Sequence, residues 1–146
     1  MASRRHTSAD GRKWDSKFEW RMANWCDNNG VTYDAQPRSF SYTTPVVNGT
    51  CVDCSSTEIV KQRSYTPDFL LHGSDFYVEA KGYLKPEARA LLQYFIKSRR
   101  DIPIRFVFQS NQKLPLKRTP RYLDWAKSVG CEAIIWDDKK GFEKWL

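Results

Sequence analysis

The chain has 146 residues, of which 40% are hydrophobic and 14% aromatic, and its formal charge is +7. This length predicts one folded domain, and the aromatic content argues against a disordered tail. No apolar run approaches the ~18 residues of a membrane helix, and no apolar segment follows the basic N-terminus to make a secretion signal. We therefore expect a soluble, intracellular protein with no membrane partner, whose positive charge attracts polyanions such as nucleic acid.

The N-terminal part combines a polar segment with a helical pattern. Residues 1–14 are basic and lack periodicity, which predicts a flexible basic arm ahead of a single domain over 15–146. Over 16–28 apolar residues recur at helical spacing until turn formers stop them, so a helix is predicted there. Asp15 or Ser16 suits its N-cap, which places Glu19 in the first turn, where a negative charge favours the helix dipole.

The next segment consists of short alternating runs and turn formers. Residues 31–47 are broken at Pro37 and Pro45, and alternation resumes only at 58–65. This pattern predicts a hairpin insertion at about 45–64 whose tip carries Cys51 and Cys54.

The second half alternates strands with helices. Two short strands, "DFLLH" and "DFYVEAKG", come first, joined by a turn. Helical connections between apolar strands then predict an α/β fold whose sheet is parallel in its second half. The expected elements are a helix over 85–101, a strand over 104–110, a helix over 119–130 and a strand over 131–136.

The stretch "YTPDFLLHGSDFYVEAKG" (65–82) places charges inside an apolar run. Because strand side chains alternate between faces, Glu79 and Lys81 share one face, with α-carbons ~6.6 Å apart. Burying both charges is costly unless they pair with each other or with a metal. Asp68, at the head of the preceding strand, can aim its carboxylate at Glu79. A solvent-facing Glu–Lys pair is the alternative for E-x-K alone, and the upstream P-D weighs against it.

Two carboxylates and a lysine around one pocket suit metal-assisted phosphodiester hydrolysis. Carboxylate oxygens are ligands for Mg²⁺, with Mn²⁺ as a plausible substitute. The metal would lower the pKa of a bound water and offset charge that builds on the phosphate. Lys81 would orient or deprotonate the attacking water, with a pKa lowered by burial and nearby cations. The first helix would bring Glu19 as a third carboxylate.

"PDFLLHGSDFYVEAK" resembles the signature of the PD-(D/E)XK nuclease superfamily. More narrowly, "YTPDFLL…FYVEAKG", "IRFVFQS" and "SKFE" resemble the bacteriophage endonuclease I family of Holliday-junction resolving enzymes, over about residues 15–135. This resemblance implies a restriction-endonuclease-like mixed sheet flanked by helices, in an intertwined homodimer. It also implies Mg²⁺-dependent cutting of four-way and other branched DNA junctions at two symmetric strands, with no small-molecule substrate.

The resemblance assigns roles to individual residues. It implies that Asp68, Glu79 and the backbone carbonyl of Ala80 are metal ligands and that Lys81 is the catalytic lysine. Glu19 takes the position of the family's helix carboxylate, which the resemblance implies is a further catalytic residue and metal ligand, supplied by the same chain or by the partner. The stretch before "YTPDF" is longer than the family's short bridge, a departure at the element that connects exchanged halves.

The chain's 4 cysteines raise the question of structural zinc. Cys51-x-x-Cys54 is half of a zinc knuckle, and its remaining ligands would be Cys26 and Cys131 or a second knuckle across a dimer axis. Plain thiols at a turn are favoured over zinc, and Cys26 and Cys131 suit core positions.

Basic residues in the arm and near the strand ends are the candidate DNA contacts. They would bind phosphates in a salt-dependent way, although each is alternatively a solvated surface charge. Trp14 is the aromatic residue best placed to stack on DNA. The alternatives to a junction-resolving enzyme are another DNA-nicking nuclease of the superfamily, of the mismatch or transposase end-cutting kind, and a non-catalytic zinc-containing nucleic-acid-binding module. The basic candidates are Arg4, Arg5, Arg12, Lys13, Lys85, Arg89, Lys113, Lys117 and Arg118.

Overall fold

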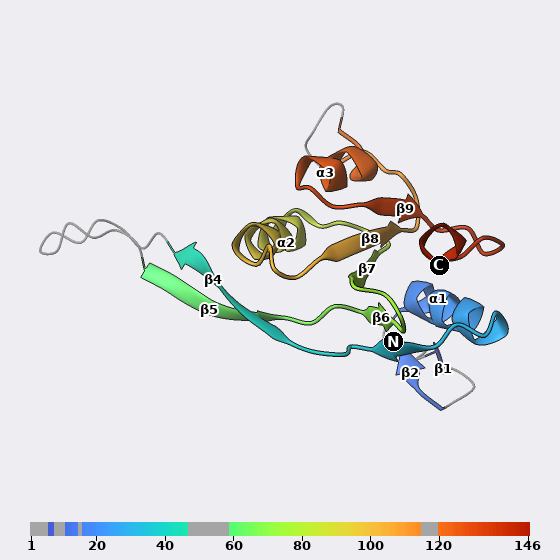
Figure 1. Ribbon diagram of the computed structural model, residues 1–146. Helices are drawn as coiled ribbons and strands as arrows, with labels where there is room; N and C mark the ends of the chain where they lie inside the picture. Colours follow the sequence, from blue (N-terminus) through green and yellow to red (C-terminus); the bar gives the residue numbers. More distant parts are fainter. Residues whose placement is uncertain (1–5, 8–10, 15, 47–58, 115–119) are drawn as a thin grey trace, which may run out of the picture.

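A computed structural model describes residues 6–7, 11–14, 16–46, 59–114 and 120–146 of the chain. In this described part, three α-helices cover the two faces of a five-stranded mixed sheet (Figure 1). The helices are α1 (Lys17–Asn28), α2 (Pro86–Ser98) and α3 (Tyr122–Ser128). In sheet order the strands are β3 (Tyr33–Ala35), β6 (Phe69–Leu71), β7 (Tyr77–Lys81), β8 (Ile104–Phe108) and β9 (Ala133–Ile135).

The sheet changes from antiparallel to parallel at β7. Strands β3, β6 and β7 pair antiparallel, whereas β7, β8 and β9 pair parallel, with α2 and α3 as the crossovers. The predicted α/β class and the parallel second half of the sheet are confirmed. The helices at 17–28 and 86–98 match the predicted spans closely, and α3 is shorter than the predicted 119–130.

The central strands are buried on both faces, since alternate side chains enter two separate cores. Val78 and Val107 pack with Met22 of α1 on one face. Phe106 and Phe108 pack with residues of α2 and α3 on the other. A short 3₁₀ helix (Glu143–Trp145) follows Phe142, which is fully buried on the α1 side. A charged side chain on either face of β7 is therefore surrounded by apolar neighbours.

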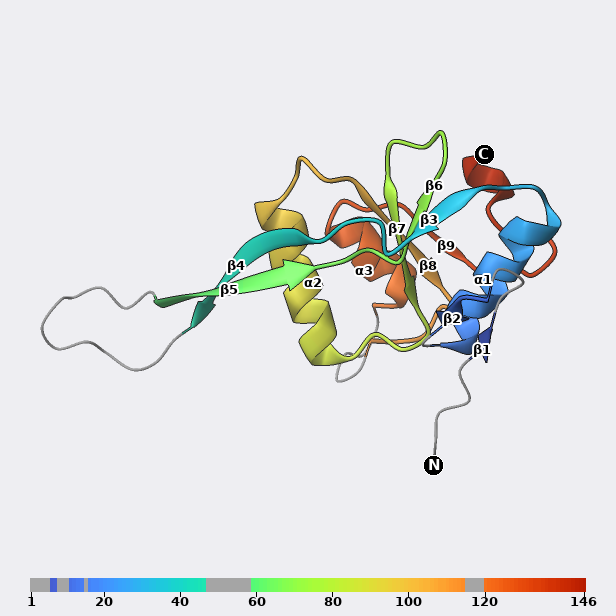
Figure 2. The same ribbon diagram turned by 90° about the horizontal axis from the view of Figure 1, so that it is seen from below.

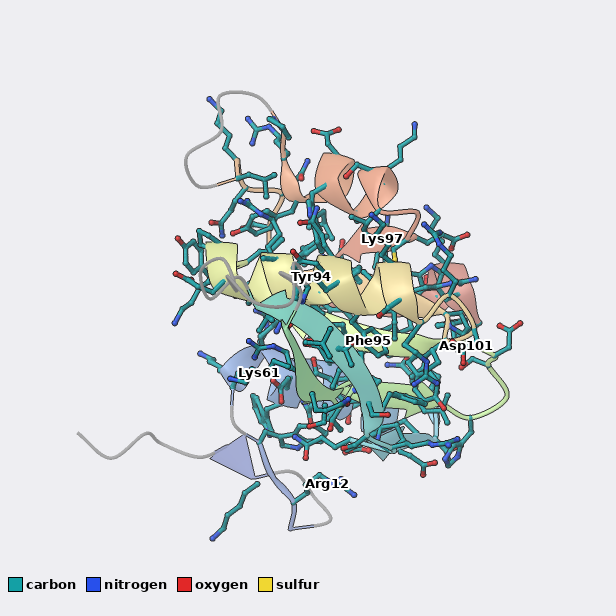
Figure 3. The ribbon with its side chains drawn as sticks, turned by 90° about the vertical axis from the view of Figure 1, so that its left-hand side faces the viewer. Arg12, Lys61, Tyr94, Phe95, Lys97 and Asp101 are labelled. Carbon is teal, nitrogen blue, oxygen red and sulfur yellow. The ribbon has the colours of Figure 1, made fainter. Side chains whose placement is uncertain are left out.

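The predicted hairpin consists of β4 (Phe40–Val46) and β5 (Ile59–Tyr65), paired antiparallel. Figures 1 and 2 show it crossing α2 and extending beyond it. Phe95 of α2, labelled in Figure 3, contacts the rings of Tyr42 and Tyr65 at centroid distances of 5.4 and 4.4 Å. The tip of the hairpin, with Cys51 and Cys54, lies outside the described residues.

Pro45 does not interrupt β4 as the sequence pattern suggested. It pairs with Val60 inside the ladder. Each strand of a two-stranded hairpin has an outer edge, where a missing N–H leaves no ladder hydrogen bond unmade. Proline was therefore a weaker breaker here than it is inside a wide sheet.

Within residues 1–14, the described residues 6–7 and 11–14 include two short strands that the flexible-arm prediction did not anticipate. Strands β1 (His6–Thr7) and β2 (Lys13–Trp14) pair antiparallel. Trp14 is 4% exposed and stacks on Phe69 at a centroid distance of 5.3 Å. The expectation that Trp14 stacks on DNA is therefore wrong, because one large aromatic ring among polar residues is anchored by the core. Within the described residues no helix is long and apolar enough to cross a membrane.

Candidate active site

The strands β6 and β7 separate at Asp68, and this separation places its carboxylate against β7. Phe69, the first residue of β6, pairs with Val78 of β7, and the Asp68 N–H donates to the Val78 carbonyl at 3.1 Å. Two residues further along β7, the Asp68 side chain replaces a backbone partner: its Oδ2 accepts a hydrogen bond from the Ala80 N–H at 2.8 Å. The preceding Pro67 is fully buried and fixes the entry of the chain.

Glu79 is a buried carboxylate with a partner on each oxygen. Its residue exposure is 4%. Lys81 Nζ lies 2.9 Å from Oε1, and the Tyr65 hydroxyl donates to Oε2 at 2.5 Å. The prediction that Glu79 and Lys81 share a face and pair is confirmed. The solvent-facing Glu–Lys pair is excluded for this strand, because Glu79 is buried, and its two partners satisfy the carboxylate there.

Glu19 lies close enough to Asp68 and Lys81 to influence both electrostatically. Ser16 caps α1 by accepting a hydrogen bond from the Glu19 N–H at 3.1 Å, as predicted, which sets Glu19 in the first turn. Its charge raises the pKa of both Asp68 and Lys81. Glu19 of the same chain thus lies within electrostatic range of Asp68 and Lys81.

Burial and the neighbouring carboxylates of Glu79 and Glu19 raise the pKa of Asp68. Burial has the largest effect and the charges of Glu79 and Glu19 follow, so the Asp68 pKa rises to about 8. The hydrogen bond from the Ala80 N–H and the charge of Lys81 work in the opposite direction. Without a bound metal ion, the Asp68 carboxyl therefore holds a proton at neutral pH. A cation bound beside it would lower its pKa and release that proton.

The pKa of Lys81 is raised, contrary to the expectation from the sequence. Burial lowers its pKa, but the charge and hydrogen bond of Glu79, with the charges of Asp68 and Glu19, outweigh burial and raise it. The predicted lowering of the Lys81 pKa is therefore wrong: the carboxylates around it dominate, and no cation near it reverses their effect among the described residues. Lys81 is an ammonium at neutral pH, able to orient or stabilise an anion rather than remove a proton.

A pocket of about 480 Å³ opens at the carboxyl ends of β7 and β8. Glu19 lines it, together with Ala80, Gly82 and Gln109. A side chain at Gly82 would crowd its surface, since a Cβ there would come within 3.0 Å of Gln109 Oε1. The pocket gives solvent and a ligand access to the edge of the carboxylate cluster.

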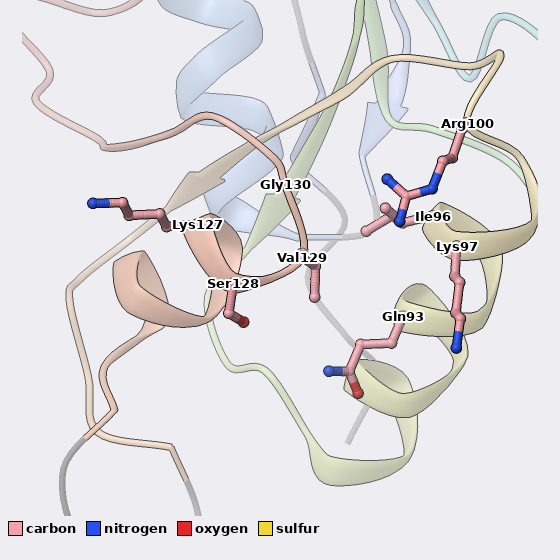
Figure 4. A pocket seen from close by; sticks show the side chains of 8 residues that line it. All are labelled: Gln93, Ile96, Lys97, Arg100, Lys127, Ser128, Val129 and Gly130. Carbon is pink, nitrogen blue, oxygen red and sulfur yellow. The ribbon is translucent and has the colours of Figure 1, made fainter.

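A second pocket, of about 340 Å³, lies between the C-terminal ends of α2 and α3 (Figure 4). Arg100 and Gly130, which precede β8 and β9, place it at the opposite end of the parallel strands. It contains no carboxylate. Its lining residues are Gln93, Ile96, Lys97, Arg100, Lys127, Ser128, Val129 and Gly130.

The donor set fits Mg²⁺ better than it fits zinc. Within the described ranges no three His, Cys, Asp or Glu side chains are close enough together to form a metal cage. Mg²⁺ needs only one or two protein carboxylates, because waters and substrate phosphate complete its shell. Asp68 and Glu79 offer those oxygens, and the mutual repulsion that raises the Asp68 pKa is what a divalent cation relieves.

Structural zinc needs four ligands, and two of the candidate thiols lie apart. Cys26 is fully buried in the core on the α1 face, as predicted, whereas Cys131 packs against the core of α2 and α3. These cores lie on opposite faces of the sheet, so Cys26 and Cys131 do not share one ion. Burial raises the pKa of the Cys26 thiol to about 12 and that of Cys131 to about 11, which disfavours the thiolate that zinc requires.

The basic candidates for DNA contact are distributed unevenly around the site. Lys85 and Lys113 are exposed near the carboxyl ends of the central strands, where Gln112 donates to the Gly82 carbonyl at 3.4 Å. Arg89 is only half-exposed, and its Nη1 is buried without a hydrogen-bond partner. Arg12 and Lys13 are exposed at β2. Outside the described residues lie Arg4, Arg5, Lys117 and Arg118.

Tyr65 is a residue of the site that the sequence analysis missed. Its only sequence signal was its position three residues before Asp68, at the end of an alternating run.

A comparison with protein-family models finds none that matches this chain, and a comparison with curated proteins also finds no match. The chemistry of the site must accordingly follow from its own residues.

Proposed function

We propose that the protein is a Mg²⁺-dependent DNA endonuclease that resolves four-way and other branched junctions, of the bacteriophage endonuclease I type. The observation that carries the proposal is the placement of Asp68, Glu79 and Lys81 around the carboxyl end of the central strand β7, within electrostatic range of Glu19. Structural ion pairs seldom place a second buried carboxylate against the first, since each raises the cost of ionising the other.

Each residue has a distinct role in this proposal. Asp68 and Glu79, with the Ala80 carbonyl, would hold Mg²⁺, which supplies an activated water and stabilises charge on the phosphate. Lys81 holds Glu79 and, as an ammonium, stabilises the negative charge that develops on the scissile phosphate. Glu19, which faces the open pocket, accepts a proton or a hydrogen bond from the attacking water.

The assembly and the finer fold class belong to the same proposal. A restriction-endonuclease-like sheet in a homodimer would present two sites, one for each of the symmetric strands of a junction. The chain's own Glu19 already acts on Asp68, so an exchange of N-terminal halves is not needed to complete a site. The positive charge of the chain favours binding to the DNA backbone.

Cleavage of a synthetic four-way junction with and without Mg²⁺ tests the proposal. We expect nicks at symmetric positions in Mg²⁺, little cutting of a matched linear duplex, and no cutting in EDTA. Asp68→Asn and Glu79→Gln should abolish cleavage and leave junction binding in Ca²⁺ within about twofold. Equal cutting of junction and linear duplex would instead identify another nicking nuclease of the superfamily. Binding that never leads to cleavage would identify a non-catalytic module.

A further inference from the structure

We infer that Tyr65 is a positioning residue that fixes the Glu79 carboxylate for metal binding, and this inference rests on the proposed function. The Tyr65 hydroxyl donates to Glu79 Oε2 at 2.5 Å, while Lys81 Nζ holds Oε1 at 2.9 Å. Two partners on different oxygens, one from β5 and one from β7 itself, determine both the position of the carboxylate and the rotation of its plane.

The ring of Tyr65 is itself held in place. It packs on Phe95 of α2 at a centroid distance of 4.4 Å and an interplanar angle of 46°. Its backbone ends the β4–β5 ladder, opposite Phe40. A side chain fixed at both its backbone and its ring loses little entropy when its hydroxyl makes a hydrogen bond, so the contact is well suited to orient a ligand.

The chemistry of the contact allows one direction of donation. A carboxylate oxygen carries no hydrogen to give, so the phenolic O–H of Tyr65 donates and Glu79 Oε2 accepts. The carboxylate therefore gains a neutral donor that leaves its negative charge available to a cation. Lys81, by contrast, neutralises that charge, and the two partners are not interchangeable.

The β4–β5 hairpin is thereby part of the site. The sequence pattern predicts an insertion at this segment, but the strand β5 supplies one of the two groups that hold Glu79. Loss of the hydroxyl would leave Oε2 buried without a donor, and the carboxylate would turn toward Lys81. Removal of a group that orients a metal ligand typically costs 10–100-fold in metal affinity or activity.

Tyr65→Phe tests the inference, with Tyr42→Phe as the matched control. Both tyrosines belong to the hairpin and contact Phe95, but only Tyr65 contacts Glu79. The measurements are single-turnover cleavage of a four-way junction in Mg²⁺, junction affinity in Ca²⁺, and Mn²⁺ affinity by calorimetry without DNA. For Tyr65→Phe we expect about 10–100-fold slower cleavage and about tenfold weaker Mn²⁺ binding, with junction affinity within twofold. Tyr42→Phe should match the wild type in all three.

The outcomes separate this inference from the proposed function. If Tyr65→Phe cleaves and binds Mn²⁺ like the wild type, the positioning role is overturned while the nuclease stands. Equal losses in both variants also overturn the positioning role, because the loss would then not depend on the hydrogen bond to Glu79. If the wild type cuts no DNA, the proposed function fails and the Mn²⁺ titration decides: weaker binding by Tyr65→Phe supports the role, whereas equal binding, or no Mn²⁺ uptake by the wild type, overturns it.

Discussion

Asp68 links the site to the stability of the whole protein. Its pKa in the folded protein, about 8, lies above the ordinary 3.8, mainly because of burial and then because of Glu79 and Glu19. The folded state therefore retains a proton that the unfolded chain releases. The stabilisation by this proton is complete below pH ~4, falls as the pH rises toward 8, and is then absent.

Asp68→Asn should accordingly stabilise the metal-free protein at high pH. The amide oxygen still accepts the Ala80 N–H, and no charge has to be buried. We expect a gain in unfolding free energy on the order of a few kcal/mol at pH 8 and little change at pH 4. Urea titrations of both proteins in EDTA at the two pH values measure it. A gain of the same size at both would show that ionisation of Asp68 is not the cause.

Lys81→Met should destabilise the fold as well as abolish cleavage. It removes the ammonium from Glu79 Oε1 and leaves a buried carboxylate with Tyr65 as its partner. Breaking one side of a buried pair typically costs about 3–5 kcal/mol. The exposed Lys85→Met is the control and should lose less than about 0.5 kcal/mol. Adding Glu79→Gln to Lys81→Met should recover most of the stability and none of the activity, and failure to recover would mean that the pair is not the source of the loss.

At the scale of residues, the sequence contained the local part of the site. Alternation along one strand was enough to place Glu79 and Lys81 together, and the proline fixed the register of Asp68. Tyr65 could not be found in this way, since its contact depends on how the hairpin packs on α2. The Lys81 pKa was missed for a related reason: its sign depends on three carboxylates, and one of them comes from a distant helix.

At the scale of elements, α1 matters because its first turn carries Glu19. Ser16→Ala removes the oxygen that accepts the Glu19 N–H and should cost about 1 kcal/mol of unfolding free energy. Fraying of that turn would also move the carboxylate, so we expect a several-fold slower junction cleavage. Ser98→Ala, at the C-terminal end of α2, is the control: its hydroxyl donates to Tyr94 O and contributes little. If Ser16→Ala slows junction cleavage no more than Ser98→Ala does, the position of Glu19 does not affect the reaction.

Helical elements were easier to predict than hairpins. Apolar periodicity over more than ten residues located α1 and α2 within a few residues, because each helix buries one continuous stripe. The β1–β2 pair left no comparable pattern, and a single tryptophan provides its anchor to the core. Short strands that gain their stability from a distant contact, here Trp14 on Phe69, carry little signal in their own sequence.

At the scale of the molecule, the two ends of the parallel strands differ in chemistry. The carboxylate cluster and the 480 Å³ pocket lie at the carboxyl ends, and the basic 340 Å³ pocket of Figure 4 lies at the other. Lys17 lines the first pocket and Lys85, the N-cap of α2, follows the carboxyl end of β7, whereas Lys97 and Lys127 line the second pocket. All four lysines are exposed, and they form two pairs, one at each end of the parallel strands.

This arrangement predicts which lysines contact the DNA phosphates. Each phosphate contact contributes about 0.9 to the slope of log Kd against log salt concentration. Lys17→Ala with Lys85→Ala should therefore lower that slope by about 2 for a four-way junction in Ca²⁺. Lys97→Ala with Lys127→Ala removes the same charge at the opposite end and should change it by less than 0.5, on the order of measurement error. Equal losses in the two double variants would mean that the positive charge of the chain attracts DNA without directing it, and junction DNA would then have no preferred path to Asp68 and Glu79.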